Sequence, residues 1–355
     1  MAHSWKFYTR TDKAWRALLV SIKKAEHSID FEKYIFTDDL IGRKFINLFL
    51  EKAKKGVQVR LLLDSHGSQH FYRSPVVHSL EDAGVEIVFF NRIFPRWVYK
   101  YSWWFLRDHR KIVIIDEEIG FIGGIGVRED TGSDRDTYLE IVGPVVDRLK
   151  RSFDRMWLRA SQKKRLFRIF KPKNNSTFDV LNNAPYPKER YIYQRLIGKI
   201  KGAKKYIYLT TPYFVPSRRL FKYLRQASKR GVDVRILIPQ NSDHPFVDRA
   251  SHSYFGRLLR NEIKIFRYKE FIHAKTAVVD GCWGMVGSSN LDNLSLLFNY
   301  EANIESKNKK FIKELENHFK KDLKKAAELH LEVWMNRSSR DKLKESVARL
   351  FRKFL

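Results

Sequence analysis

Two short segments of this 355-residue chain repeat one pattern of reactive side chains. The first runs from His109 to Asp116 and the second from His273 to Asp280, and both read H-x-K-x-x-x-x-D. Near neutral pH a histidine can act as a nucleophile or as a general acid and base. The lysine two residues later would project from the same face of a strand, and its ammonium suits an anion because it cannot bind a metal while protonated. The pattern therefore predicts chemistry on an anionic group.

The surroundings of the two motifs are repeated as well. Gly123 and Gly287 each follow the motif histidine by 14 residues, and Asp136 and Glu301 follow it by 27 and 28 residues. A Lys/Arg-Gly-Val-x-Val-Arg segment also occurs upstream in both halves. We therefore interpret the chain as a tandem duplication with one half-site in each half.

Two such half-sites would surround one phosphate with two histidines and two lysines. This suits a two-step exchange of phosphodiesters, in which one histidine attacks phosphorus while the other protonates the departing alkoxide and then deprotonates the incoming hydroxyl. Each histidine needs an acceptor that fixes its tautomer, and Asp136 and Glu301 are the candidates. The phosphate oxygens would be bound by the residues after Gly287, namely Ser288, Ser289 and Asn290. The predicted catalytic residues are His109, Lys111, Asp116, His273, Lys275 and Asp280.

Strands must carry both motifs, because each motif sits on an apolar, β-branched run that ends at a turn signal. Helical and strand patterns alternate through the first half, and the order restarts near residue 189. This predicts an α/β fold with a central sheet covered on both faces. Residues 162–188, rich in Lys, Arg, Asn and Pro, break the alternation. We expect a first half at 1–161, a linker at 162–188, and a second half at 189–355 that ends in basic helices.

The charge balance indicates a polyanionic partner. The chain has 69 Lys and Arg against 40 Asp and Glu, a net charge of +29, which suits an anionic membrane surface or nucleic acid. The single cysteine excludes an intramolecular disulfide and favours a reducing compartment. No run of about 18 apolar residues is present, so we expect no spanning helix. These features predict a cytoplasmic protein, peripheral on the inner face of the cell membrane.

One insertion distinguishes the two halves. The first half places residues 91–108 before its motif, whereas the second half uses only residues 269–272. The insertion interleaves aromatic residues with Arg and Lys, which suits a lipid headgroup layer but also stacking on unpaired bases, or packing of the loop onto its own core. The predicted membrane contacts are Trp97, Trp103 and Trp104.

The paired motifs, with Gly-Gly after the first and Gly-Ser-Ser-Asn after the second, resemble the phospholipase D superfamily. Longer segments are similar to bacterial cardiolipin synthases, namely Glu32–Phe36, Thr211–Pro216, Ser242–Asp248, Ser289–Ser295 and Asn299–Ala302. The resemblance implies two α-β-α sandwich halves with one shared active site at the seam, and no metal or other cofactor. It implies transfer of a phosphatidyl group from phosphatidylglycerol to the hydroxyl of another lipid, with His109 as nucleophile and His273 as acid and base. Gly126 departs from the family's pattern, which has asparagine there and so one more phosphate donor.

Other readings of the same residues stay open. A nuclease of the superfamily would use the same site on nucleic acid, which is a less favoured partner, and a lipase would transfer the phosphatidyl group to water. His244 and His252 lie near two aspartates, but their spacing fits no standard set of metal ligands. The acceptor, its headgroup and the oligomeric state are not determined by the sequence.

Overall fold

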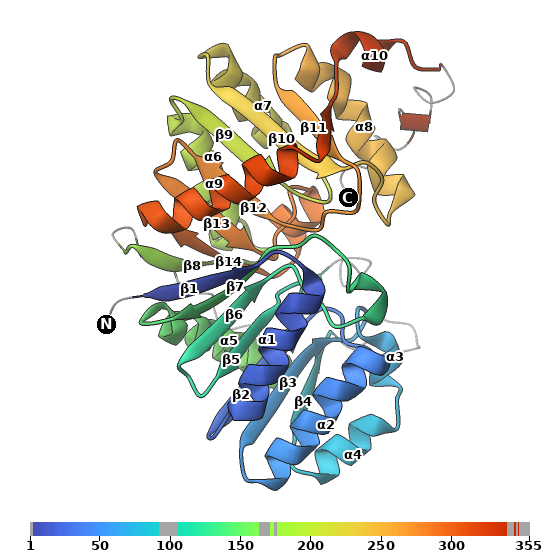
Figure 1. Cartoon of the computed structure of the whole chain (residues 1–355), viewed down its shortest axis with the longest axis vertical. Helices are drawn as coiled ribbons and strands as arrows, with labels where there is room; N and C mark the ends of the chain where they lie inside the picture. The colour runs from blue at the N-terminus through green and yellow to red at the C-terminus, as the bar shows by residue number, and fades with distance from the viewer. Residues whose placement is uncertain are drawn as a thin grey trace.

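The structure, a computed structural model, describes residues 3–91, 106–162, 171–173, 176–338, 344, 345 and 347. The chain forms two halves stacked along its long axis, the first coloured blue to green and the second yellow-green to red (Figure 1). Each half is a mixed sheet with helices packed on it. The predicted α/β class with two sandwich halves is confirmed.

The described part of the first half contains seven strands: β1 (Ser4–Tyr8), β2 (Ser28–Lys33), β3 (Gln58–Asp64), β4 (Glu86–Phe90), β5 (Ile112–Ile115), β6 (Ile119–Gly123) and β7 (Tyr138–Val142). Its helical segments are α1 (Thr11–Lys24), α2 (Leu40–Lys54), α3 (Gln69–Tyr72), α4 (Val76–Asp82), η2 (Glu129–Thr131) and α5 (Val145–Gln162). The sheet order is β1-β7-β6-β5-β2-β3-β4. Strands β2, β3 and β4 are parallel, and the remaining pairs are antiparallel.

Among its described residues, the second half has eight strands: β8 (Phe178–Asn183), β9 (Tyr206–Thr210), β10 (Asp233–Pro239), β11 (Lys264–Tyr268), β12 (Thr276–Val279), β13 (Trp283–Gly287), β14 (Glu301–Ser306) and β15 (Ala326–Glu328). Its helical segments are η3 (Pro187–Glu189), α6 (Tyr191–Gly202), α7 (Arg218–Lys229), α8 (Pro245–Leu259), η4 (Leu294–Phe298), α9 (Lys309–Leu323) and α10 (Leu331–Met335). The sheet order is β15-β11-β10-β9-β12-β13-β14-β8.

The two sheets correspond strand for strand. Read from one edge, β8-β14-β13-β12-β9-β10-β11 repeats β1-β7-β6-β5-β2-β3-β4, with β15 added at the far edge. The parallel strands of the second half are β9, β10 and β11, the counterparts of β2, β3 and β4. This correspondence agrees with the tandem duplication that the repeated motifs predicted.

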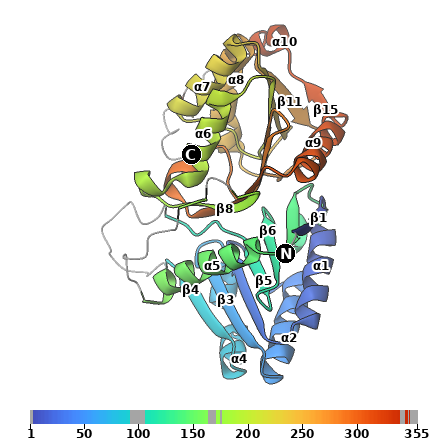
Figure 2. The ribbon, with the colours of Figure 1, turned by 90° about the vertical axis from the view of Figure 1, so that its left-hand side faces the viewer.

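Three hydrophobic clusters hold the layers together. Along β3, Val59, Leu61 and Leu63 pack with α1 and α2, while Leu62 belongs to a central cluster that also contains residues of the second half. This alternation is that of a strand buried on both faces. Helices α5 and α9 contribute to the central cluster, and α1 and α5 lie on opposite sides of the first sheet (Figure 2). The two halves therefore share one continuous core at the seam.

The predicted linker at 162–188 is wrong in part. Helix α5 ends at Gln162, and residues 178–183 form β8, which pairs antiparallel with β14 over six residues. The second sheet therefore begins inside the predicted linker. The Asn and Pro residues near this segment made it look like a loop in the sequence. Its side chains are nevertheless buried, because β8 contacts both β14 and α5. Most of the predicted basic segment at the carboxyl end lies outside the described residues.

Candidate active site

The two motifs enter the sheets at equivalent places near the seam. His109 and Lys111 immediately precede β5, and His273 and Lys275 immediately precede β12. In each motif the lysine Nζ donates a hydrogen bond to the carbonyl oxygen of its own histidine, at 2.7 Å in the first half. This bond holds each lysine ammonium beside the backbone of its own histidine.

Each motif histidine contacts a carboxyl group of the opposite half. Nδ1 of His109 lies 2.8 Å from Oε1 of Glu301, and Nδ1 of His273 lies 2.8 Å from Oδ2 of Asp136. Both carboxyl groups are buried, whereas 13% of the His109 side chain and 23% of the His273 side chain are exposed. The sequence predicted both carboxyl groups as orienting residues but not this crossed arrangement.

Backbone bridges across the seam explain the crossing. The N–H of His109 donates to the carbonyl of Tyr300 at 3.0 Å, and the N–H of His273 donates to the carbonyl of Arg135 at 2.8 Å. Tyr300 and Arg135 are the residues directly before the two carboxyl groups. Each motif therefore runs beside the carboxyl residue of the other half. Each backbone bridge brings one motif histidine within hydrogen-bond distance of that carboxyl group.

The two carboxyl groups differ in their ionisation. Burial raises the pKa of Asp136, but the ammonium of Lys275 and the bond from His273 outweigh burial, so this pKa lies below its usual value. Burial raises the pKa of Glu301 well above its usual value, and neighbouring groups offset the effect only in part. Asp136 is therefore the carboxylate of the site, whereas Glu301 competes with His109 for one proton.

Burial and mutual repulsion disfavour positive charge on the basic groups. Burial and the charge of Lys111 lower the pKa of His109 well below its usual value. Burial also lowers the pKa of His273, although Asp136 acts in the opposite direction. Burial lowers the pKa of Lys111 to about 7 and that of Lys275 to about 8. An anion bound among these groups would favour their charged forms, so the site is suited to a phosphodiester.

The segment after Gly287 supports the second half-site. Ser288 Oγ donates to Glu301 and accepts from the N–H of Ala302 at 3.1 Å. The N–H of Ser289 donates to Asn303 at 3.2 Å. Oδ1 of Asn290 is buried and accepts no hydrogen bond from the described residues. Ser288 and Ser289 are thus held within the fold, and Asn290 keeps an unused acceptor.

The corresponding segment of the first half has no polar side chains. A Cβ on Gly124 would lie 2.6 Å from Oδ2 of Asp136, so only glycine fits beside this carboxylate. Nζ of Lys33 donates to the carbonyl of Ile125 at 3.0 Å and to the hydroxyl of Tyr138 at 2.7 Å. Lys33 lies in the Glu32–Phe36 segment that carried the family resemblance but was not predicted as a site residue. It supports this loop where hydroxyl and amide side chains support its counterpart.

The motif aspartates do not lie with the histidines. Asp116 follows the far end of β5, and its carboxylate accepts three backbone N–H groups at the start of β2, at 2.7–2.9 Å. Asp280 makes the same three bonds at the start of β9. Both residues have positive φ values, of 52° and 53°. The structure thus places these two predicted catalytic residues in turns, and their contacts there tie β5 to β2 and β12 to β9.

Two aromatic rings flank the histidines and were not predicted as site residues. The ring of Tyr34 lies 5.0 Å from that of His109, and the Lys111 ammonium lies 5.3 Å from the Tyr34 ring. The ring of Phe271 stacks on His273 at 5.8 Å. Tyr34 lies within a segment that carried the family resemblance, whereas nothing in the sequence marked Phe271. These rings restrict the orientation of both imidazoles.

Several predictions concern other parts of the chain. The predicted membrane contacts Trp97, Trp103 and Trp104 lie outside the described residues. Within the described part of the chain, no cluster of three His, Cys, Asp or Glu side chains could hold a metal ion. No helix of that part is long and apolar enough to cross a membrane.

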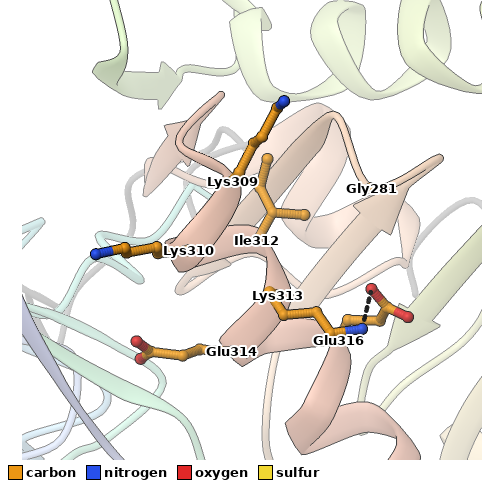
Figure 3. A pocket seen from close by; sticks show the side chains of 7 residues that line it. All are labelled: Gly281, Lys309, Lys310, Ile312, Lys313, Glu314 and Glu316. Carbon is orange, nitrogen blue, oxygen red and sulfur yellow. Dashed lines mark ion pairs between the residues drawn. The ribbon is translucent and has the colours of Figure 1, made fainter.

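A surface hollow of about 540 Å³ lies away from the histidines. It is lined by Gly281, in the turn at the far end of β12, and by α9 residues from Lys309 to Glu316. Figure 3 shows Lys309 and Lys310 pointing in different directions, and Lys313 pairs with Glu316 at 3.7 Å. The lysines thus do not converge on one point, and the hollow is separate from the candidate site.

Comparison with known proteins identifies the family. The profile of the family described as cardiolipin synthase, PLD-like domain, matches residues 18–157 and 196–323. Cardiolipin synthase of Listeria innocua is 35% identical over 348 residues, covering 94% of this chain and 72% of that protein. The chain belongs to the cardiolipin synthase family. Within this family, cardiolipin synthase 1 of Bacillus cereus is 33% identical, over 97% of this chain and 71% of that protein.

Two solved structures share the fold of this chain, whose family model is described as PLD-like. Phosphatidylserine synthase of Haemophilus influenzae superimposes with a TM-score of 0.78 at 13% identity, covering 99% of this chain and 95% of that one. Polyphosphate kinase of Porphyromonas gingivalis gives a TM-score of 0.62 at 16% identity, covering 93% of this chain and 49% of that one. At these identities the likeness concerns the fold alone. It extends over both halves of the chain.

Proposed function

We propose that the chain is a phosphatidyltransferase that makes cardiolipin from phosphatidylglycerol and a second phospholipid through a phosphohistidine intermediate. The observation that carries the proposal is the crossed pair of His–carboxyl contacts, at 2.8 Å each, in a chain of the cardiolipin synthase family. Two histidines, each oriented by the opposite half, meet the requirement for a nucleophile and a separate proton carrier.

In the first step Nε2 of His109 attacks phosphorus of phosphatidylglycerol. The bond between phosphorus and the glycerol oxygen breaks, and His273, which enters the step as an imidazolium, donates its proton to that oxygen, so glycerol leaves neutral and His273 becomes an uncharged imidazole. In the second step His273 accepts a proton from the hydroxyl of the acceptor lipid, whose oxygen attacks phosphorus and releases His109. Both imidazoles end as they began, so the cycle needs no other reactant.

The electrostatics support these roles. The pKa of His109 lies well below its usual value because of burial and the charge of Lys111, so its imidazole is uncharged and can attack. When Nδ1–H of His109 donates to Glu301, the lone pair of Nε2 is free. Asp136 is ionised, as its lowered pKa indicates, and its charge stabilises the imidazolium form in which His273 enters the first step and to which it returns in the second.

The phosphate would be bound by the two motif lysines together with Ser288, Ser289 and Asn290. The proposal is supported by the contact of Ser288 with Glu301 and by the position of the three residues directly after β13. Gly126, the counterpart of Asn290, supplies no side-chain donor. We further propose that the protein acts peripherally on the inner face of the cell membrane, with Trp97, Trp103 and Trp104 as membrane contacts. Its net charge of +29 supports an anionic surface as the partner.

The test is mass spectrometry of lipids after incubation of the purified protein with phosphatidylglycerol vesicles, with and without phosphatidylethanolamine. We expect cardiolipin and free glycerol in equal amounts, and neither product with the variants His109→Ala and His273→Ala. Phosphatidic acid alone would make water the acceptor and the enzyme a lipase. Unchanged lipid beside shortened single-stranded DNA, run as a parallel sample, would make it a nuclease.

A further inference from the structure

The outer helices of the second half carry an unusual distribution of charge. Residues 190–232, which include α6, β9 and α7, contain twelve Lys and Arg and no Asp or Glu. The corresponding residues 10–57 of the first half contain eleven Lys and Arg and seven Asp and Glu. Because the two halves share one architecture, the fold itself does not require a surface free of carboxylates.

Most of these cations lie on the surface. Nine of them are exposed, and we call this group the α6–α7 patch: Lys201, Lys204, Lys205, Arg218, Arg219, Lys222, Arg225, Lys229 and Arg230. Four residues of α7, at spacings of four, three and four, form one stripe along the helix: Arg218, Lys222, Arg225 and Lys229. The opposite face of α7 packs into the core through Leu220, Phe221 and Leu224. The stripe therefore faces away from the protein.

The positive charge of the patch is not balanced by carboxylates of the described residues. Like charges three or four residues apart on a helix repel each other and destabilise it. Around the half-buried Tyr223, the charged groups of Lys201, Arg219 and Lys222 all lie within 6.0 Å of the ring centre. Among the described residues, no carboxylate forms an ion pair with any of the nine patch cations. An external anionic surface would relieve this repulsion.

The patch begins beside the candidate active site. Helix α7 follows the segment 211–217, in which Thr211 Oγ1 accepts a hydrogen bond from the N–H of Leu291 at 3.1 Å. Phe214 also forms a backbone bridge with Leu291, the residue after Asn290. The first turn of α7 therefore lies near the phosphate-binding segment, while Lys204, Lys205 and Arg230 lie toward the other end of the helices. A surface bound along α7 would reach the edge of the site.

We propose that the α6–α7 patch is a surface, additional to the tryptophans proposed above, by which this protein docks onto an anionic phospholipid bilayer. This inference rests on the proposed function only in that the substrate is a membrane lipid. A bilayer fits better than nucleic acid because the stripe carries no exposed aromatic ring on which bases could stack, and Tyr223 is half-buried. Anionic headgroups attract each Lys or Arg near the surface, and the attraction weakens with salt.

The experiment compares two charge-reversed variants that have the same net charge. The patch variant is Arg218→Glu, Lys222→Glu, Arg225→Glu and Lys229→Glu. The matched control reverses four exposed lysines on the equivalent helices α1 and α2, namely Lys13→Glu, Lys23→Glu, Lys44→Glu and Lys54→Glu. None of these eight side chains forms an ion pair with a described residue. A second patch variant with glutamine at the same four positions removes charge without adding carboxylates, and circular dichroism checks the fold of each protein.

Binding is measured by co-sedimentation with vesicles of phosphatidylglycerol and phosphatidylcholine, beside vesicles of phosphatidylcholine alone. We expect the patch variant to bind the anionic vesicles about tenfold more weakly or worse, the glutamine variant to bind with intermediate strength, and the control to bind within about twofold of the parent protein. Equal losses in the patch variant and the control would show that only net charge matters and would overturn the proposal. So would unchanged binding of the patch variant, or parent protein that binds single-stranded DNA but not vesicles.

Turnover is measured separately on phosphatidylglycerol dispersed in neutral detergent, where no bilayer is present. The patch variant should keep its turnover there, because none of the four residues belongs to the site. Parent protein that binds vesicles through the patch but makes no cardiolipin in either assay would contradict the proposed function and leave the docking surface standing.

Discussion

Replacing Asp136 by asparagine tests the crossed arrangement, because Asp136 belongs to the first half but contacts the histidine of the second. The substitution keeps the shape of the side chain and an oxygen that can accept the N–H of Thr137. It removes the charge 2.8 Å from Nδ1 of His273. The amide can also donate to Nδ1, which would place the imidazole in the wrong tautomer. Asp136→Asn should therefore impair His273 while leaving the fold intact.

The expected loss follows from this one contact. A hydrogen bond to a charged group contributes about 1.5–3 kcal/mol, and about 1.4 kcal/mol corresponds to a tenfold change in rate. The loss of kcat should thus be about tenfold to a hundredfold from the charge alone, and larger if the tautomer also changes. Asp130→Asn, which removes a carboxylate that is 67% exposed in the same half, is the matched control and should have little effect.

The pH profile shows which histidine is affected. Asp136 raises the pKa of His273, and His273 must be protonated to release glycerol. Without the carboxylate this pKa falls, so the decline of kcat/KM at high pH should move to lower pH in Asp136→Asn. The assay is glycerol release across pH, with thermal unfolding as a check on the fold. A kcat within about threefold of the parent, or an unmoved high-pH limb, would refute the crossed roles.

Three further predictions concern other contacts. Asp116→Ala should lower the free energy of unfolding by about 1–3 kcal/mol in denaturant titrations, with kcat almost unchanged. A large loss of kcat in folded protein would show that Asp116 takes part in catalysis. Lys111 has a pKa of about 7, so its ammonium deprotonates as pH rises through that value and KM should increase above about pH 7. Lys111→Met should have a higher KM that no longer rises with pH near pH 7. If the slope of KM against pH were the same in the variant as in the parent protein, the role of Lys111 would be contradicted. Ser288→Ala removes a donor to Glu301 and should lower kcat about tenfold, whereas Ser288→Thr, which keeps the hydroxyl, should recover part of it.

The repeated motifs allowed the sequence to predict one shared site with its histidines, lysines and orienting acids. The crossed pairing could not be predicted, because Asp136 and Glu301 stand at nearly equal offsets and would also fit an arrangement within each half. It depends on the backbone bridges at Arg135 and Tyr300, which join segments distant in sequence. Strand spacing could have corrected the prediction that Asp116 is a catalytic residue. Seven residues of extended chain separate His109 from Asp116 by roughly 23 Å, which is too far for both to contact one phosphate.

Other features depend on packing that periodicity does not reveal. Strand β8 is flanked by Asn and Pro, and it is recognised as a strand only through its pairing with β14. Lys33 is the last residue of β2, directly after Glu32, and its contact with the loop after β6 became visible only from its bond to Ile125. The α6–α7 patch was present in the sequence as a stretch without carboxylates, but its significance required the matched helices of the first half for comparison.

The central claim is that His109 forms the covalent intermediate, and trapping that intermediate tests it most directly. The variant His273→Ala is mixed with a phosphatidyl ester of a good phenolate leaving group, which departs without a proton, and the digested protein is analysed by mass spectrometry. The account predicts about one phosphatidyl group per chain, on the peptide that contains His109, and none with His109→Ala. A phosphatidyl group on the His273 peptide of the His109→Ala variant, with none on His109 in the first experiment, would contradict it.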